Sequence, residues 1–429
     1  MHAMTQPMIS HLPYFESLAE ETDEQSSGWR EQSAGLLALR LFDNWDRARR
    51  RIAPSVEAVR ALAVRSEVES LEAVSAVRAP LLSLIDAMLA VPSAPLAVRA
   101  SLLSYAGRLR AEGQWRLAAD VFRTVVETRE PTDISPESYQ AAMDCGYCAR
   151  LGGDLEEAAI AYDVGEAIAT AAHDTFGRLR AKVGKAKLTI HRGNLPQADL
   201  ELQAIVRAAE AAQCGPALSL ALTDRMAVAG MRGQFESAAV LGYRALECCE
   251  DGSAREAILS DLATALGDAG ERAAARDAHL VLSATARDVR VRWTSMINLM
   301  NLAAHDGERS AFDRYSAELD AIGLSGELLP RYAIALGDGY ECFGEVEAAR
   351  SAYQLAVATS SASGPADVLV RAEAALTSLD RRSRSRTVAP ARATENVSYD
   401  GITLGTVTRG VRAMRERIGA VSWMTAVAP

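Results

Sequence analysis

The chain repeats one arrangement of apolar and polar positions seven times. Each copy has apolar residues at helical spacing, then a short polar turn that contains a glycine, then a second apolar stretch at the same spacing. The turns lie at Gly113, Gly153, Gly193, Gly233, Gly270, Gly307 and Gly344, which are 40 residues apart up to Gly233 and 37 apart after it. A fixed period of this size predicts helix pairs that bury their apolar faces only by stacking on their neighbours.

Each glycine falls where a first helix has to end, because glycine adopts the left-handed cap conformation without steric cost. Five residues later a small side chain is expected to let the two helices approach closely. It is Ala118, Ala158, Ala198, Ala238, Ala275 and Ala349, with Phe312 as the exception. A larger residue one turn further on is expected to fill the groove between the helices, as at Phe122, Tyr162, Leu202 and Tyr353.

This pattern resembles the tetratricopeptide repeat. The last unit matches the family's spacing at Leu336, Gly337, Tyr340, Gly344, Ala349, Tyr353 and Ala356. The second unit matches it at Cys145, Gly146, Gly153, Leu155, Ala158 and Tyr162. The resemblance covers about residues 96 to 379, and its units are longer than the family's usual length of about 34 residues. It implies an all-α fold, a right-handed superhelical array of antiparallel helix pairs.

The changes of pattern along the chain predict five segments. They are a flexible N-terminal segment (1–28), an atypical or degenerate helical cap (29–95), an array of about seven helix pairs (96–380), a basic linker (381–399) and a C-terminal tail (400–429). In the tail Val407, Val411, Met414, Ile418 and Val421 recur at helical spacing between arginines, which predicts a basic amphipathic helix. Three roles remain open for it: capping or docking on the array, binding an anionic membrane, or engaging a partner or nucleic acid.

Bulk composition narrows the choice of partner and compartment. Apolar residues make up 49% and charged residues 24%, which is typical of a folded soluble protein. A net charge of -10 argues against nucleic acid as the main partner, because phosphate binding needs clustered positive charge. The N-terminus lacks the pattern of a secretory signal and no stretch is long enough to span a bilayer, so we expect a cytoplasmic protein. The excess of arginine over lysine is typical of GC-rich bacterial genomes.

The sequence predicts neither catalysis nor a cofactor or metal. Cys145 and Cys148 have the spacing of a redox motif, but Cys145 falls on the expected buried face of a first helix, so packing is the better interpretation. The histidines are scattered, and no phosphate-binding glycine loop or nucleophile elbow is present. An enzyme would need a site that these motifs do not show.

The resemblance implies a binding surface along the first helix of each pair. Its groove spacing selects Arg110, Gln140, Met143, Tyr147, Arg150, Arg180, Lys187, His191, Asn301, His305 and Arg331 as partner-binding residues, with Asp338 beside them. The basic members would grip a carboxylate or an acidic segment, and Asn301 would pair with a peptide amide. The alternative is that these are ordinary solvated side chains on helix faces.

The function expected from this surface is that of a non-enzymatic scaffold that binds a protein or peptide. The alternative is a sensor of a ligand or peptide, in which occupancy of the groove controls a partner or the chain's own tail. An acidic peptide fits the basic residues, a nucleic-acid partner is not expected, and formation of a homo-oligomer is left open.

Overall fold

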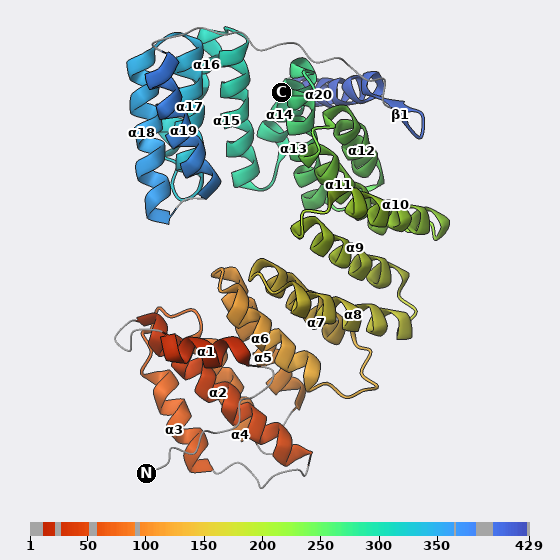
Figure 1. Cartoon of the computed structure of the whole chain (residues 1–429), viewed down its shortest axis with the longest axis vertical. Coiled ribbons are helices and arrows are strands. Elements are labelled where there is room, and N and C mark those ends of the chain that lie inside the picture. The colour runs from red at the N-terminus through yellow and green to blue at the C-terminus, as the bar shows by residue number, and fades with distance from the viewer. Residues whose placement is uncertain are drawn as a thin grey trace. The chain divides into compact units, whose positions relative to one another are not determined.

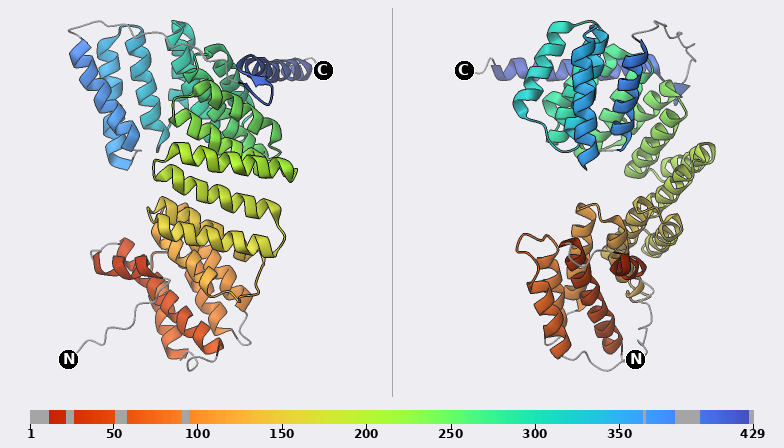
Figure 2. Two further views of the ribbon diagram at one scale, coloured as in Figure 1. Left: turned by 45° about the vertical axis from the view of Figure 1, so that its right-hand side comes forward. Right: turned by 60° about the vertical axis from the view of Figure 1, so that its left-hand side comes forward.

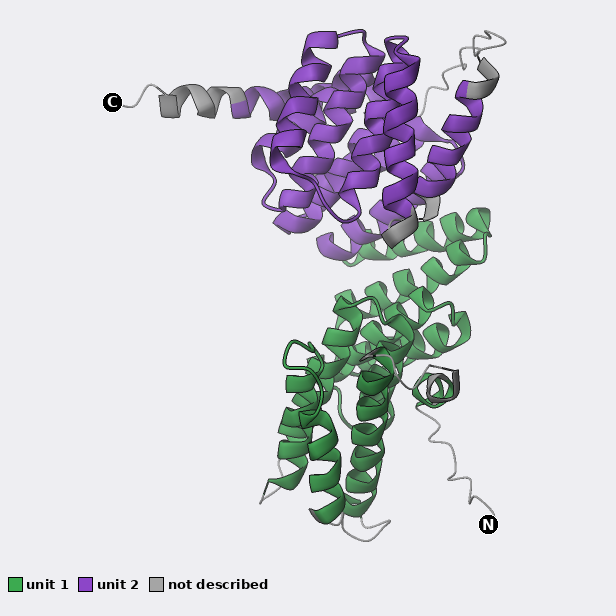
Figure 3. Cartoon of the chain, turned by 90° about the vertical axis from the view of Figure 1, so that its left-hand side faces the viewer, with its two compact units in different colours: residues 1–214 green, residues 215–429 purple. Residues whose placement is uncertain are grey.

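The computed structural model describes residues 12–21, 27–50, 58–90, 95–363, 366–382 and 398–426. These residues are almost entirely helical, as Figure 1 shows. They form two compact units, residues 1–214 and 215–429, which are coloured separately in Figure 3 and are described here one at a time. The predicted basic linker falls mostly on residues 383–397, which lie outside the described residues.

Unit 1 contains four preceding helices and three helix pairs. The preceding helices are α1 (Pro13–Glu21), α2 (Ser27–Arg49), α3 (Ala58–Glu69) and α4 (Arg78–Leu89). The pairs are α5 (Pro95–Ala111) with α6 (Trp115–Glu127), α7 (Pro136–Leu151) with α8 (Leu155–Ala171), and α9 (Thr175–His191) with α10 (Leu195–Ala211). Each pair packs on the next, because α6 contacts α7 and α8 contacts α9.

Unit 2 continues the repeat with four pairs and a closing helix. The pairs are α11 (Gly215–Met231) with α12 (Phe235–Cys248), α13 (Gly252–Asp268) with α14 (Arg272–Thr285), α15 (Val289–His305) with α16 (Arg309–Ile322), and α17 (Leu328–Cys342) with α18 (Val346–Ser363). Then follow α19 (Ala366–Arg382), the strands β1 (Ser398–Tyr399) and β2 (Ile402–Thr403), and α20 (Leu404–Ala426). The predicted antiparallel helix pairs are confirmed.

The glycine turns have the geometry that the sequence predicts. All seven glycines have a positive φ, between 72° at Gly233 and 90° at Gly153 and Gly270. In the second turn the N–H of Asp154 reaches back to the carbonyl of Ala149 at 2.9 Å, which closes the first helix. The Asp154 side chain then accepts the N–H of Glu157 at 2.9 Å and caps the second helix. One short turn therefore ends one helix and begins the next.

Inside each pair, one large and one small residue face each other across the two helices. In two pairs the small residue is a glycine on the first helix, and a Cβ there would lie 2.6 Å from the Tyr162 ring at Gly146 and 2.5 Å from the Tyr353 ring at Gly337. In the α11–α12 pair the order is reversed, since Gly242 on the second helix makes room for Met226 on the first. In the other pairs the corresponding residues lie seven positions before the turn glycine and nine positions after it. They are Ala106 and Phe122, Ala186 and Leu202, Ala263 and His279, and Met300 and Ser316. The sum of the two volumes stays similar, as close packing requires.

Phe312, the exception at the small-residue position, is accommodated by the following pair. Its ring is fully buried and lies against Gly339 on α17, where a Cβ would clash with it. The ring also packs edge-on against Tyr340 and Phe343, with centroids 5.5 Å and 5.4 Å away. A glycine on the neighbouring helix thus replaces the small residue that its own turn lacks.

The N-terminal segment expected to be flexible contains the docked helix α1. Asp120 on α6 is fully buried, and its Oδ2 accepts the backbone N–H groups of Tyr14 at 2.8 Å and Phe15 at 2.9 Å. The Tyr14 hydroxyl donates to Oδ2 of Asp154 at 2.7 Å. Burial raises the pKa of Asp120 to about 7, although these backbone bonds and Arg123 oppose the rise. A carboxylate from another part of the chain therefore holds the start of α1.

The C-terminal tail forms a hairpin and a helix that dock on unit 2. Helix α20 lies against α12 and α14, with Val407 and Val411 fully buried, and Figure 2 shows its position in two views. Arg415 Nη1 donates to Oδ1 of Asp277 on α14 at 2.6 Å. Docking on the array is thus the arrangement of the tail in the structure, and it uses the second helices of two pairs.

A substitution at Gly337 tests the pairing of large and small residues. Gly337→Ala places a methyl group into the Tyr353 ring, and overpacking of this kind typically costs about 1–3 kcal/mol. Adding Tyr353→Leu, which copies the Ala186 and Leu202 combination, should make the double variant more stable than the sum of the two single changes predicts. Urea unfolding followed by helical circular dichroism measures this.

Gly107→Ala is the control for that experiment. Gly107 is a helical glycine on α5 with nothing near its missing Cβ, so alanine should leave stability equal or raise it slightly. Equal losses at Gly107 and Gly337, or strictly additive effects of the two changes in unit 2, would contradict the size pairing.

The seat of α20 predicts a difference between two glycines of that helix. A Cβ at Gly410 would clash with the Tyr243 ring of α12, whereas at Gly405 it would make only ordinary contacts, with Nη1 of Arg409 at 3.6 Å and Oγ1 of Thr403 at 3.8 Å. Gly410→Ala should therefore lower the amide-exchange protection of residues 404–418, and Gly405→Ala should preserve it. Protection that drops equally in both variants would show that α20 does not depend on this contact.

Candidate functional site

The first helices α7 and α9 of unit 1, together with one tyrosine of α8, present a group of cationic and aromatic side chains. We call Tyr147, Arg150, Tyr162, Arg180 and His191 the Arg150 cluster. Tyr147 and Arg150 come from α7, Arg180 and His191 from α9, and Tyr162 from α8. Tyr147 is 39% exposed, which places the cluster at an accessible surface.

Arg150 is surrounded by neutral acceptors and an aromatic ring. Its Nη1 lies 2.6 Å from Nε2 of His191, and its guanidinium group lies near the Tyr162 hydroxyl. Its guanidinium carbon lies 5.4 Å from the centre of the Tyr147 ring, within range of a cation–π interaction. Because arginine only donates, Nε2 of His191 is the acceptor and the imidazole is neutral in this arrangement.

The surroundings of His191 favour that neutral form. Partial burial lowers the pKa of His191 first, and the positive charges of Arg150 and Lys187 lower it further. The imidazole thus stays uncharged beside two cations, and its Nε2 remains able to accept a hydrogen bond.

Arg180 repeats this environment one helix further along. Its Nη1 donates to Oε1 of Gln140 at 3.1 Å, and its guanidinium carbon lies 6.0 Å from the centre of the Tyr139 ring. The Tyr139 hydroxyl donates to the carbonyl of Gly177 at 2.9 Å, which ties the ring to α9. Both arginines are therefore held by aromatic rings and amide or imidazole acceptors.

Two glycines explain why Tyr162 reaches this surface from a second helix. The Tyr162 ring lies against Gly146 of α7 and Gly184 of α9, where added Cβ atoms would be 2.6 Å and 2.7 Å away. The ring is buried between the two first helices while its hydroxyl contacts Arg150. Burial raises the pKa of Tyr162, and the nearby Arg150 and Arg180 lower it in part.

The arginines of the cluster differ in charge balance from two other cations of unit 1. Lys185 pairs with Asp163 and Glu166, and Arg123 pairs with Glu157. Among the described residues, Arg150 and Arg180 form no ion pair. The cluster is therefore a concentration of uncompensated positive charge, which is suited to an anionic group.

Arg110 and Met143, which are both expected at the groove, are not part of the Arg150 cluster. Arg110 on α5 is already paired with Asp144, whose Oδ1 lies 2.7 Å from its Nη1. Met143 differs from the expectation, since it is 5% exposed and its sulfur packs against Gly165 of α8. Lys187 stands near enough to His191 to influence its pKa. Of the residues expected at the groove, the Arg150 cluster thus contains Tyr147, Arg150, Arg180 and His191, with Gln140 bound to Arg180 and Lys187 near His191.

The other residues expected at the groove, Asn301, His305 and Arg331, lie in unit 2. Arg331 is exposed on α17, and Nδ1 of His305 on α15 lies 3.6 Å from the sulfur of Cys342. Asn301 is half-buried on α15, and its Oδ1 is buried with no hydrogen-bond partner among the described residues.

Sequence reasoning missed Trp115 and Tyr139 as members of the site. The Trp115 ring meets the Tyr147 ring edge-on, with centroids 5.9 Å apart, and Tyr139 supports Arg180. The available signal was the presence of aromatic residues at the start of α6 and α7, next to the expected groove positions.

Other candidate chemistry is placed in the core. Cys145 and Cys148 are buried, and burial raises the pKa of the Cys145 thiol well above its ordinary value and that of Cys148 to about 12. Within the described residues no group of three metal-ligating side chains occurs. In the same residues, no helix is both long and apolar enough to cross a membrane.

The helix pairs, the left-handed glycine turns and the close-packed small residues are those of a known repeat. The fold is a tetratricopeptide-like helical repeat. No family model matches the sequence, and no curated protein matches it. Among solved structures, the apo form of RapI has 11% identity, covers 76% of this chain and 97% of its own, and has a TM-score of 0.45.

Two further solved structures show the same kind of resemblance. A tetratricopeptide repeat protein from Parabacteroides merdae has 15% identity, covers 65% of this chain and 98% of its own, and has a TM-score of 0.42. BtubC from P. vanneervenii has 14% identity, covers 46% of this chain and 84% of its own, and has a TM-score of 0.37.

The arrangement around His191 gives a pH-dependent prediction for this repeat protein. Arg150→Gln removes a positive charge next to the imidazole, so the pKa of His191 should rise, although burial still holds it below its ordinary value. Proton NMR of the imidazole C–H signals across a pH titration measures this, with His191→Gln to assign the signal.

Arg108→Gln provides the matched control. Arg108 is an exposed arginine of α5 outside the cluster, and its loss changes the net charge equally. An identical shift in both variants, or no shift in either, would mean that Arg150 does not contact His191 in solution.

Proposed function

We propose that the chain is a non-enzymatic binding protein that holds an extended peptide or protein segment on the first-helix face of unit 1. In this proposal an anionic group of the partner, such as a carboxylate, binds Arg150 and Arg180. The observation that carries it is that both guanidinium groups lie at an accessible surface with only neutral acceptors. A carboxylate would give them charge-assisted hydrogen bonds in place of neutral ones.

The surroundings of the two arginines favour binding over ordinary solvation. A free surface arginine loses side-chain entropy when a ligand fixes it. Here Tyr147 and Tyr139 already restrict the guanidinium groups through cation–π contacts, so less freedom is lost when an anion arrives. His191 can give up the Arg150 donor to the ligand because its Nε2 lies at the exposed end of α9.

In unit 2 we propose a separate contact at Asn301. A buried acceptor without a donor costs free energy, and Oδ1 of Asn301 is such an atom among the described residues. A backbone N–H of an extended peptide is a donor of the right kind. Arg331 and His305 are proposed to contact the segment that binds at Asn301.

A peptide selection with charge-matched variants tests the proposal at the Arg150 cluster. A pool of short peptides is selected on the full-length wild type and on Arg150→Gln with Arg180→Gln, and the enriched peptides are measured by calorimetry. Losing a charge-assisted hydrogen bond typically costs about 1.5–3 kcal/mol. Because the double variant loses two such bonds, about 3–6 kcal/mol in all, it should bind at least about 100-fold more weakly.

Two comparisons make this result specific to the cluster. Arg108→Gln with Arg178→Gln, two exposed arginines outside it, should bind the enriched peptides as the wild type does. Replacing the acidic groups of the peptide by amides should have the same effect as the cluster variant. Peptides that bind the cluster variant and the wild type equally would refute the proposed site.

A further inference from the structure

The glycine turns give the second helices a common register. The residue five positions after each glycine is buried, and it is small in every repeat except at Phe312. The residue nine positions after the glycine packs toward the first helix, as Tyr162, Gly242 and Tyr353 show. The residue seven positions after the glycine is rotated by about 200° from the small residue, so it faces away from the first helix. We call it the outer position, and it is occupied by Asp120, Ile160, Leu200, Val240, Asp277, Arg314 and Ser351.

The chain covers three of its own outer positions with terminal helices. Asp120 is 0% exposed because α1 lies on it and donates two backbone N–H groups to it. Val240 is 0% exposed and Asp277 5% exposed on α12 and α14, the two helices against which α20 lies. Helices α1 and α20 come from opposite ends of the sequence, yet both lie on residues at the outer position.

Two outer positions of unit 1 are aliphatic and bare. Ile160 on α8 is 59% exposed and Leu200 on α10 is 60% exposed. Ala204 and Ala208 continue the line from Leu200 at intervals of one turn, and both are exposed. We call these four residues the outer stripe. Ile160 and Leu200 hold the outer position of consecutive helix pairs, and both side chains are exposed, unlike Asp120, Val240 and Asp277.

We propose that the outer stripe of α8 and α10 is a docking surface for an amphipathic helix of a partner protein, one with aliphatic residues four positions apart and arginines beside them. The model for this occupant is α20, which covers the same register in unit 2. Its Val407 and Val411 are four residues apart and fully buried there. This inference concerns the face opposite to the peptide site and does not rest on it.

The chemistry of the stripe matches this type of helix. On α12 close approach is possible because α20 presents Gly410 to the Tyr243 ring. On α10 the residues that continue the line from Leu200 are the small Ala204 and Ala208, which allow close approach of a second helix. The exposed carboxylates Glu156 and Glu210 on the same two helices suit flanking arginines.

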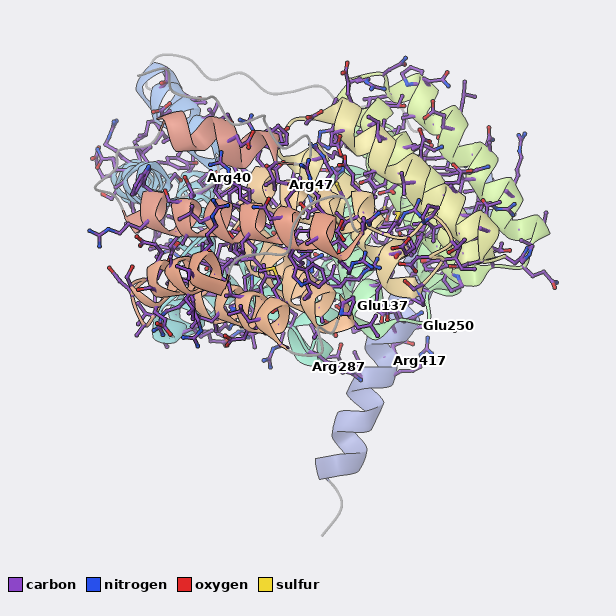
Figure 4. The ribbon with its side chains drawn as sticks, turned by 90° about the horizontal axis from the view of Figure 1, so that it is seen from below. Arg40, Arg47, Glu137, Glu250, Arg287 and Arg417 are labelled. Carbon is purple, nitrogen blue, oxygen red and sulfur yellow. The ribbon has the colours of Figure 1, made fainter. Side chains whose placement is uncertain are left out.

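Two arguments favour a separate partner over a second copy of α20. Arg415 of α20 is bound to Asp277, and the outer stripe has no carboxylate at the outer position to replace it. The hairpin ahead of α20 is also held by α11 and α12, with Arg225 of α11 5.7 Å from the Tyr399 ring and Arg244 of α12 3.9 Å from Asp400. Burial raises the pKa of Tyr243 on α12, and Arg417, labelled on α20 in Figure 4, opposes that rise in part.

A peptide with the sequence of residues 404–426 and the change Arg415→Ala serves as the probe for the stripe, because Arg415 would have no carboxylate at the outer position to pair with. The labelled peptide is titrated with full-length protein, whose own α20 occupies the α12–α14 site, and fluorescence anisotropy follows binding. Saturable binding is expected, weakened at least tenfold by Ile160→Asp or Leu200→Asp. Leu355→Asp, an equivalent change at a 44% exposed leucine of α18, should leave binding unchanged. A peptide with Val407→Asp and Val411→Asp should not bind.

Several results would overturn the proposal. Absence of saturable binding would do so, as would binding that survives both stripe substitutions and increases with Asp277→Ala, because the peptide then enters the α20 site. A wild type that sediments as a dimer and becomes a monomer with Ile160→Asp would assign the stripe to self-association. Leu200→Gln with a helical circular dichroism spectrum guards against misfolding, and it should also weaken binding.

Discussion

The contact between one large and one small residue inside each helix pair controls the rest of this structure. Gly146 and Gly337 admit the rings of Tyr162 and Tyr353, and Gly242 admits Met226 from the opposite side. Because the summed volume decides how closely two helices pack, these contacts fix the spacing on which every further pair stacks. The tyrosine version has an additional effect, since its hydroxyl emerges between two first helices and places a polar atom at the binding face.

The two tyrosines show how the same packing supports opposite charges. In unit 1 the Tyr162 hydroxyl meets Arg150, whereas in unit 2 the Tyr353 hydroxyl donates to Oδ1 of Asp338 at 2.7 Å and Oε2 of Glu341 at 3.2 Å. Arg371 then pairs with Asp338 at 2.6 Å, which compensates the negative charge. No such compensation exists at Arg150 among the described residues. The repeat therefore keeps its core, and the charges around each tyrosine decide what the surface attracts.

Local rules predicted the parts of the fold that depend on local sequence. The glycine turns and the helix pairs follow from periodicity and from the φ that glycine allows, and the structure confirms them. The seats of α1 and α20 depend on contacts such as Tyr14 with Asp120 and Arg415 with Asp277, which are separated by 106 and 138 residues. Periodicity contains no information about such contacts. The same limit applies to the site: groove spacing selected Arg150 and Arg180, but it also selected Met143, which Gly165 draws into the core.

The central claim is that Arg150 and Arg180 bind an anionic group on the first-helix face of unit 1. The most direct measurement is nitrogen-15 NMR of the arginine side-chain Nε–H groups while a selected acidic peptide is titrated into the full-length protein. The account predicts that the Nε–H signals of Arg150 and Arg180 shift together with peptide occupancy, and that the amide form of the peptide does not shift them. Saturable binding of the acidic peptide with both signals unmoved would contradict the account.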